Sequence, residues 1–178
     1  VNLSNPRYVD YHDTQWGVPV HDDRFLFEML VLEGAQAGLS WETILNKREA
    51  YRCAFDNFEP EIVAQYDDTK KIDLLANAGI IRNRRKIDSA IQNARVFLKI
   101  QEELGSFEHY LWNWVAGKPI VLRAKTLAEI PVTSSLSDAI STDLKKRGMS
   151  FVGSTIIYAY MQAVGLINGH TTDCFRCV

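Results

Sequence analysis

Leu32-Glu33-Gly34-Ala35-Gln36-Ala37-Gly38-Leu39-Ser40-Trp41 is the stretch around which the fold is organised, and it follows an apolar run that begins at Phe25. The run predicts a buried helix with Glu33 at its end, where removing a carboxylate from water is costly unless the group has a partner or a function. A buried carboxylate beside two glycines and an indole face could hold a flat, polar, cationic ring. The alternative is an ordinary helix–turn–helix in which Glu33 caps a neighbouring helix or pairs with an arginine.

Helical periodicity extends outward from this stretch in both directions, and no alternating strand pattern persists. Asp22, Ser40 and Asp68 are suitable N-caps, and Pro60 suits the first turn of a helix. The helices that we expect cover residues 22–32, 41–52, 61–65, 70–77, a long segment from 84, and then 107–115, 137–147 and 151–165. Residues 1–21, 119–134 and 169–178 read as irregular. The predicted fold class is all-α.

The composition indicates one globular domain over residues 1–178, with 47% apolar and 24% charged residues. No apolar run is long enough for a membrane span, and no signal-peptide pattern opens the chain, although a chain that begins with Val1 is expected to have lost its initiator. Three cysteines are too few for a disulfide framework and favour a reducing, cytosolic setting. Of these, Cys53 lies on an apolar helix face and is expected in the core.

The net charge of −2 does not indicate nucleic-acid binding, so that function would need a local basic patch. One such patch follows the turn Ala78-Gly79-Ile80-Ile81-Arg82 and contains Arg82, Arg84, Arg85 and Lys86. The turn has the composition of a helix-hairpin-helix, in which a glycine lets backbone N–H groups approach a DNA phosphate. Basic residues at a helix N-terminus oppose the helix dipole, so a bound anion would relieve a cost. The alternative is a solvated helix start.

A possible metal site lies at the two ends of the chain. His170 and Cys174 have the H-x-x-x-C spacing that can chelate one zinc ion through imidazole and thiolate. His12 lies in the other terminal segment, so a zinc ion could join residues 1–21 to residues 166–178. Cys177, or a residue before Val1, could be the fourth ligand. A single His/Cys pair more often has no metal.

Aromatic residues near Glu33 form a third group: Tyr8, Tyr11, Trp16 and Trp41. Core packing is the usual role of such residues, so each could equally belong to the interior. No serine–histidine–aspartate arrangement, phosphate-binding loop or dinucleotide-binding glycine motif occurs in the sequence.

Taken together, these residues resemble the bacterial type I DNA-3-methyladenine glycosylases of the helix-hairpin-helix superfamily. The resemblance runs nearly end to end, through Tyr11-His12-Asp13-x-x-Trp16-Gly17, Leu32-Glu33-x-x-x-Ala37-Gly38-Leu39-Ser40-Trp41, Ala78-Gly79-Ile80-Ile81-Arg82, Leu144-Lys145-Lys146-Arg147-Gly148, Phe151-Val152-Gly153, Met161-Gln162-Ala163-x-Gly165-Leu166 and His170-x-x-x-Cys174.

The resemblance implies a monofunctional enzyme that flips 3-methyladenine out of alkylated double-stranded DNA and hydrolyses its N-glycosidic bond. It implies a helix-hairpin-helix around residues 70–100, a bacterial cytoplasmic location, and no membrane or obligate protein partner; a monomer is the default. Glu33 would be the catalytic pocket carboxylate. Four aromatic residues would bind the base: Tyr8, Tyr11, Trp16 and Trp41. The DNA backbone would be bound by Gly79, Ile80, Ile81, Arg82 and Arg84.

For the metal, the resemblance implies one structural zinc ion held by His12, His170, Cys174 and an N-terminal cysteine. No cysteine precedes His12 in this sequence, so we expect the fourth ligand to lie before Val1, with Cys177 as the alternative. An aromatic residue that the family often has near that cysteine is also missing.

Two other functions stay open on the sequence. A bifunctional glycosylase/lyase would need a nucleophilic lysine in the second helix of the hairpin, where the candidates read as solvated. A non-catalytic DNA-binding module would bind DNA without releasing a base, and it gives no reason to bury Glu33.

Overall fold

A computed structural model describes residues 1–177 and confirms the predicted helical fold class. The α-helices of the described residues are α1 (Pro6–Thr14), α2 (Asp23–Gln36), α3 (Trp41–Ala54), α4 (Pro60–Val63), α5 (Asp68–Ala76), α6 (Arg84–Leu104), α7 (Phe107–Asn113), α8 (Ser135–Lys146) and α9 (Ser154–Ala163). The described residues also form two 3-10 turns and two short strands. These are η1 (Asp56–Phe58), η2 (Leu127–Glu129), β1 (Ile120–Val121) and β2 (Ile167–Asn168). None of these helices is long and apolar enough to cross a membrane.

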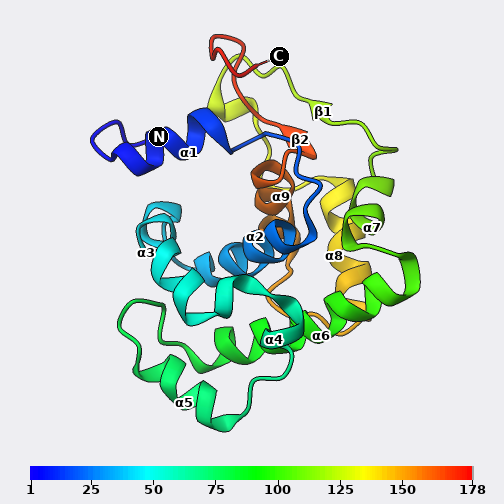
Figure 1. Cartoon of the computed structure of the whole chain (residues 1–178). Helices are drawn as coiled ribbons and strands as arrows, with labels where there is room; N and C mark the ends of the chain where they lie inside the picture. Colours follow the sequence, from blue (N-terminus) through cyan, green and yellow to red (C-terminus); the bar gives the residue numbers. More distant parts are fainter. Residues whose placement is uncertain (178) are drawn as a thin grey trace.

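Helix α2 is the centre of the molecule. Every residue from 26 to 35 on it is buried, because α3, α6, α7 and α9 all pack against it (Figure 1). The hydroxyl of Tyr160 on α9 donates a hydrogen bond to the Leu26 carbonyl at 3.1 Å, which ties the two central helices together. A polar side chain within residues 26–35 is therefore shielded from bulk water.

The helix starts follow local capping signals. The side chains of Asp22 and Ser40 accept hydrogen bonds from the amides of Phe25 and Thr43, as expected for N-caps. The N-cap of α5 is Asp67 rather than Asp68, one residue earlier than predicted. The central helix continues beyond Leu32 to Gln36, which places Glu33 inside its last turns.

The structure differs from the sequence prediction at several places, and helix ends such as those of α7 and α9 lie two or three residues inside the predicted ranges 107–115 and 151–165. Residues 6–14 form α1 instead of an irregular segment, because Asn5 caps the Arg7 amide and Pro6 occupies the first helical position. Only Tyr11 of this helix is buried, so an apolar periodicity is hardly visible. The strands β1 and β2 pair in parallel over two residues each, which is too short for an alternating pattern. Cys53 is exposed rather than in the core.

The two terminal segments lie side by side at one end of the molecule, beyond the C-terminal end of α9 (Figure 1). The amides of Gly17 and Val20 donate to the carbonyls of Gln162 and Val164, at 2.9 and 3.1 Å. Gly165 has φ +76°, and a Cβ there would collide with the Val18 backbone, so only glycine permits this close approach. The chain after α1 is thus held against the chain after α9.

Candidate active site

One cavity of about 290 Å³ lies among α1, the end of α2, the start of α3, α9 and the C-terminal segment. It contains the predicted catalytic residue, all four predicted base-binding residues and all three predicted metal ligands. Its lining comprises Val1, Tyr8, Tyr11, His12, Trp16, Glu33, Gln36, Trp41, Leu127, Ala159, Gln162, Gly169, His170, Thr171 and Cys174. Residues that are more than 160 positions apart in the sequence therefore meet here, as the His12–Cys174 contact shows.

Glu33 is the buried acid of this cavity. Its side chain is 4% exposed, and its Oε2 atom has no hydrogen-bond partner among the described residues. No cation of the described chain lies within ion-pair distance, so the alternative of a structural arginine pair does not hold. Burial raises the pKa of Glu33 to about 8 from its ordinary 4.5. The carboxyl therefore holds its proton in most molecules at neutral pH while the cavity contains no positive charge.

Two aromatic walls stand beside this acid. The rings of Tyr11 and Trp41 are 5.2 Å apart at an interplanar angle of 45°, and the indole Nε1 of Trp41 is buried with no hydrogen-bond partner in residues 1–177. Burial, followed by the Glu42 and Glu33 carboxylates, raises the pKa of Tyr8. Burial and Glu33 also raise the pKa of Tyr11 well above its ordinary value. Both phenols are thus neutral, electron-rich rings at physiological pH.

Gln36 and Gln162 also line the cavity, and neither is among the predicted site residues. Gln36 stands one helical turn after Glu33, so its place on the same face of α2 follows from helical spacing. Gln162 lies in Met161-Gln162-Ala163-x-Gly165-Leu166, one of the stretches that carry the family resemblance, and that signal could have indicated it. A Cβ at Gly169 would collide with its side-chain amide, so that glycine makes room for the Gln162 side chain at the cavity wall.

His12, His170 and Cys174 lie together, and their ligand atoms are all within 4.8 Å of one another. Nδ1 of His12 lies 2.7 Å from Asp13 Oδ1, and Nδ1 of His170 lies 2.9 Å from Asn168 Oδ1. These acceptors favour a proton on each Nδ1 and leave each Nε2 as a lone-pair donor, which is how metal-binding histidines are oriented. His170 Nε2 is buried without a partner in the described chain, and burial lowers the pKa of His170 to about 4.

The turn between α5 and α6 only partly matches its predicted role. The Gly79 amide donates to Asn77 Oδ1 at 2.8 Å, the Ile80 amide to the Asn77 carbonyl, and the Ile81 amide to the Tyr51 hydroxyl at 3.1 Å. These amides are used within the chain, and Ile80 is buried. The side chains of Arg82 and Arg84 are exposed. The amides of Gly79, Ile80 and Ile81 are therefore not free to bind a phosphate, and the exposed groups of this turn include the basic side chains of Arg82 and Arg84.

A second helix–turn–helix connects α8 to α9 through residues 147–153. Its Ser150 carbonyl accepts hydrogen bonds from Ser89 Oγ and Asn93 Nδ2 of α6, at 3.0 and 2.9 Å. Gly153 is the N-cap of α9 and has no side chain, so the first amides of this helix receive no hydrogen bond from a capping side chain. The basic end of α8 and the two glycines, Gly148 and Gly153, are the sequence signals that could have indicated this turn.

A sequence model of the methyladenine glycosylase family matches residues 2–177. The chain belongs to this family. It is 49% identical over 170 residues to DNA-3-methyladenine glycosylase 1 of Escherichia coli (strain K12), covering 96% of this chain and 91% of that protein. It is 42% identical over 167 residues to the DNA-3-methyladenine glycosylase of Haemophilus influenzae (strain ATCC 51907 / DSM 11121 / KW20 / Rd), covering 94% and 90% of the two chains.

A solved structure matches the fold over nearly the whole chain. That structure is of 3-methyladenine DNA glycosylase I from Staphylococcus aureus and describes how that protein recognises 3-methyladenine. The two sequences are 38% identical, and the TM-score is 0.96 over 99% of this chain and 94% of that one. The predicted family and enzyme class are thereby confirmed. As a methyladenine glycosylase, the chain is a hydrolase of N-glycosyl bonds, and the non-catalytic module is not favoured.

Proposed function

We propose that this methyladenine glycosylase takes 3-methyladenine from alkylated double-stranded DNA into the cavity at Glu33 and hydrolyses the bond between the base and C1′, leaving an abasic site. The observation that supports this site is that two residues lining one cavity, Glu33 and Trp41, each carry a buried polar atom, Oε2 and Nε1, with no partner among the described residues. Such atoms reduce stability, so a ligand that satisfies them explains why they are there.

The chemistry of the lesion suits this arrangement. Methylation at N3 makes the adenine a cationic leaving group, so its bond to the sugar is already weak. Flipping the nucleotide out of the stack costs a few kcal/mol and less for a damaged base. The faces of Tyr11 and Trp41 would favour a cationic ring over neutral adenine by about 1–2 kcal/mol. Tyr8 and Trp16 would complete the aromatic wall.

Glu33 would add a second source of discrimination, because its ionisation responds to the charge of the base. A cation beside a carboxyl favours the ionised form, so entry of the methylated base would expel the Glu33 proton to solvent. The carboxylate would accept a hydrogen bond from the exocyclic amine and stabilise positive charge on the sugar as the C1′–N9 bond breaks. Water then adds to C1′ and loses a proton. Neutral adenine would leave Glu33 protonated.

The direct test of the function is base release from methylated DNA, with the free bases separated by chromatography. We expect 3-methyladenine to be released and the DNA backbone to stay intact at the abasic site. Binding of the DNA without release of any base would contradict the proposal and favour a DNA-binding module.

A lyase activity has no support at Lys86, the lysine in the first turn of α6. Lys86 Nζ donates to the carbonyls of Ala35 and Ala37, at 2.8 Å each, and Lys86 does not line the cavity. An amine held by two carbonyl groups is a poor nucleophile for the sugar. Borohydride should therefore trap no covalent adduct between the protein and methylated DNA.

For the metal, we propose that His12, His170 and Cys174 are three of the ligands of one zinc ion. The buried, unpartnered His170 Nε2 and the oriented imidazoles fit this role. A zinc ion in a four-ligand site has no open position for water, so it would act as a cross-link between the termini.

Metal analysis of the protein should find about one zinc per chain, and Cys174→Ser should lose it. Removing a cross-link between chain segments costs about 2–3 kcal/mol, so the melting temperature should fall by about 4–12 °C. Cys53→Ser, a change at an exposed cysteine outside the cluster, is the matched control. Full zinc content in Cys174→Ser would exclude this ligand set.

For the DNA backbone, we propose that Gly79, Ile80 and Ile81 shape the α5–α6 turn and that Arg82 and Arg84 contact phosphates. Loss of one phosphate contact lowers the slope of log affinity against log salt by about 0.9. Arg82→Ala and Arg84→Ala should each reduce the slope by that amount. Lys99→Ala, an exposed residue farther along the same helix, should leave it unchanged. Equal slopes in all variants would remove both arginines from the interface.

A further inference from the structure

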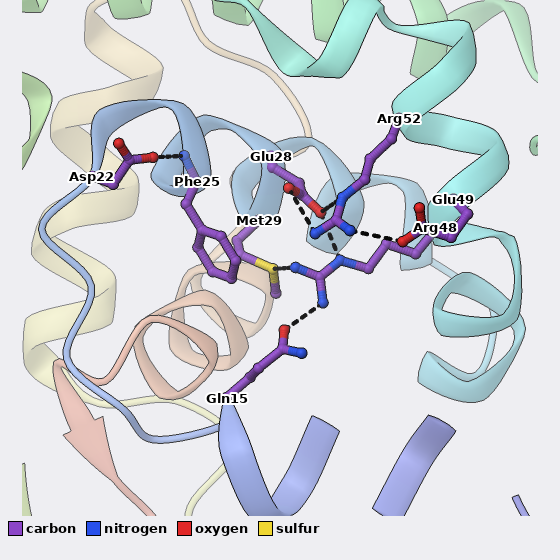
Figure 2. Close-up of polar contacts among 8 residues, drawn as sticks. All are labelled: Gln15, Asp22, Phe25, Glu28, Met29, Arg48, Glu49 and Arg52. Carbon is purple, nitrogen blue, oxygen red and sulfur yellow. Dashed lines mark hydrogen bonds and ion pairs between the residues drawn. The ribbon is translucent and has the colours of Figure 1, made fainter. Parts of the chain in front are cut away.

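A buried ion cluster lies where α2 faces α3, away from Glu33. Arg48 Nε donates to Glu28 Oε1 at 2.6 Å, and Arg52 Nε donates to the same oxygen at 3.0 Å (Figure 2). Glu28 and Arg48 are 6% and 5% exposed. Burying charges incurs a desolvation penalty that the pair often fails to repay, so stability alone is a weak reason for this cluster.

The two arginines differ in what else they contact. Arg48 Nη1 donates to Gln15 Oε1 at 2.6 Å, and its guanidinium lies 5.2 Å from the centre of the Phe25 ring. Arg52 instead sends Nη1 to Glu49 on its own helix, at 2.7 Å. Figure 2 shows this division: the Arg48 side chain points to Gln15, whereas Arg52 stays between α2 and α3. Arg48 therefore joins three elements and Arg52 only two.

The three elements that Arg48 joins are those that supply the aromatic and acidic walls of the cavity. Gln15 is the C-cap of α1, which carries Tyr8 and Tyr11. Glu28 lies on α2 with Glu33, and Arg48 lies on α3, which begins at Trp41. Because α1 buries only one residue, apolar packing alone does little to fix its position. Polar contacts hold it at both ends, through Asn5 to Glu42 at 2.8 Å and through Gln15 to Arg48.

We propose that Arg48 is a positioning residue for base recognition. Through Gln15 it holds α1 so that the Tyr11 ring keeps its place opposite Trp41 and beside Glu33. This inference rests on the proposed function, because it concerns the same cavity. The competing explanation is that the cluster only stabilises the contact between α2 and α3, in which case Arg52 would matter as much as Arg48.

The test is the affinity of the protein for free 3-methyladenine, measured by quenching of tryptophan fluorescence, together with the melting temperature. Gln15→Leu removes the contact of Arg48 with α1 but keeps its pair with Glu28. We expect binding to weaken about tenfold, the effect of losing one hydrogen bond to a charged group. Gln15→Glu keeps an acceptor for Arg48 and should bind within about twofold of wild type.

Arg52→Gln is the matched control, since it removes a contact to Glu28 without touching α1. It should lower the melting temperature and leave the affinity unchanged. In a Tyr11→Ala background, Gln15→Leu should have little further effect on affinity, because the ring that it positions is gone.

Wild-type affinity in Gln15→Leu would overturn the inference while leaving the proposed function intact. So would an equal loss in Arg52→Gln, or full additivity of Gln15→Leu with Tyr11→Ala. Failure of the wild-type protein to bind 3-methyladenine would instead count against the proposed function, and the inference would fall with it.

Discussion

Replacing Glu33 with glutamine is expected to slow excision of 3-methyladenine by about 100- to 1000-fold, the loss typical of removing one preorganised electrostatic group from an active site. Glutamine keeps the size of the side chain and can still accept a hydrogen bond from the base. It cannot become negative, so it cannot stabilise the charge that develops on the sugar. The effect should appear in single-turnover rates, where product release does not contribute.

The matched control for this variant is Glu61→Gln, the same chemical change at an exposed position on α4. It should leave the single-turnover rate unchanged. Binding of Glu33→Gln to the methylated DNA should persist, because the variant leaves the proposed phosphate contacts of Arg82 and Arg84 unchanged. A near-normal rate in Glu33→Gln would remove Glu33 from catalysis and leave it, at most, a role in reading the base.

The site could be predicted where the signal is local in the sequence. Glu33 is a charged residue at the end of an apolar run, and the cap at Ser40 fixes the start of the next helix and so the position of Trp41. The spacing of His170 and Cys174 near the C-terminus is also a local signal. The family resemblance adds His12 to the same predicted set of metal ligands. The structure contains these local features because each is determined by hydrogen bonds and burial within a single segment.

The parts that could not be predicted depend on contacts between distant segments. The Ile81 amide donates a hydrogen bond to the hydroxyl of Tyr51, thirty positions away in the sequence. The composition of the turn alone could not show that this amide already has an acceptor. Likewise, the pairing of Glu28 with Arg48 and of Arg48 with Gln15 joins three separate helices. No helical period relates these positions, because the packing of α1, α2 and α3 creates the relation.

The carboxyl of Glu33 should also make stability depend on pH, in a direction opposite to that of most acidic groups. Its pKa is raised to about 8 in the folded protein from an ordinary 4.5. Between these values the folded protein keeps a proton that the unfolded chain has released. Raising the pH therefore favours unfolding, and the stability contributed by the protonated form is complete below 4.5 and lost as pH rises through about 8.

Relative to Glu33→Gln, the wild-type protein should lose up to about 1.4 kcal/mol of unfolding free energy per pH unit within that window, and about 5 kcal/mol in total. Urea unfolding of both proteins at several pH values from 5 to 9 measures this difference. The histidines and the terminal cysteines are common to both proteins, so their titration cancels in the comparison. Parallel stability profiles would mean that Glu33 is solvated in the folded state, and the proposed proton release on entry of a cationic base would then have no source.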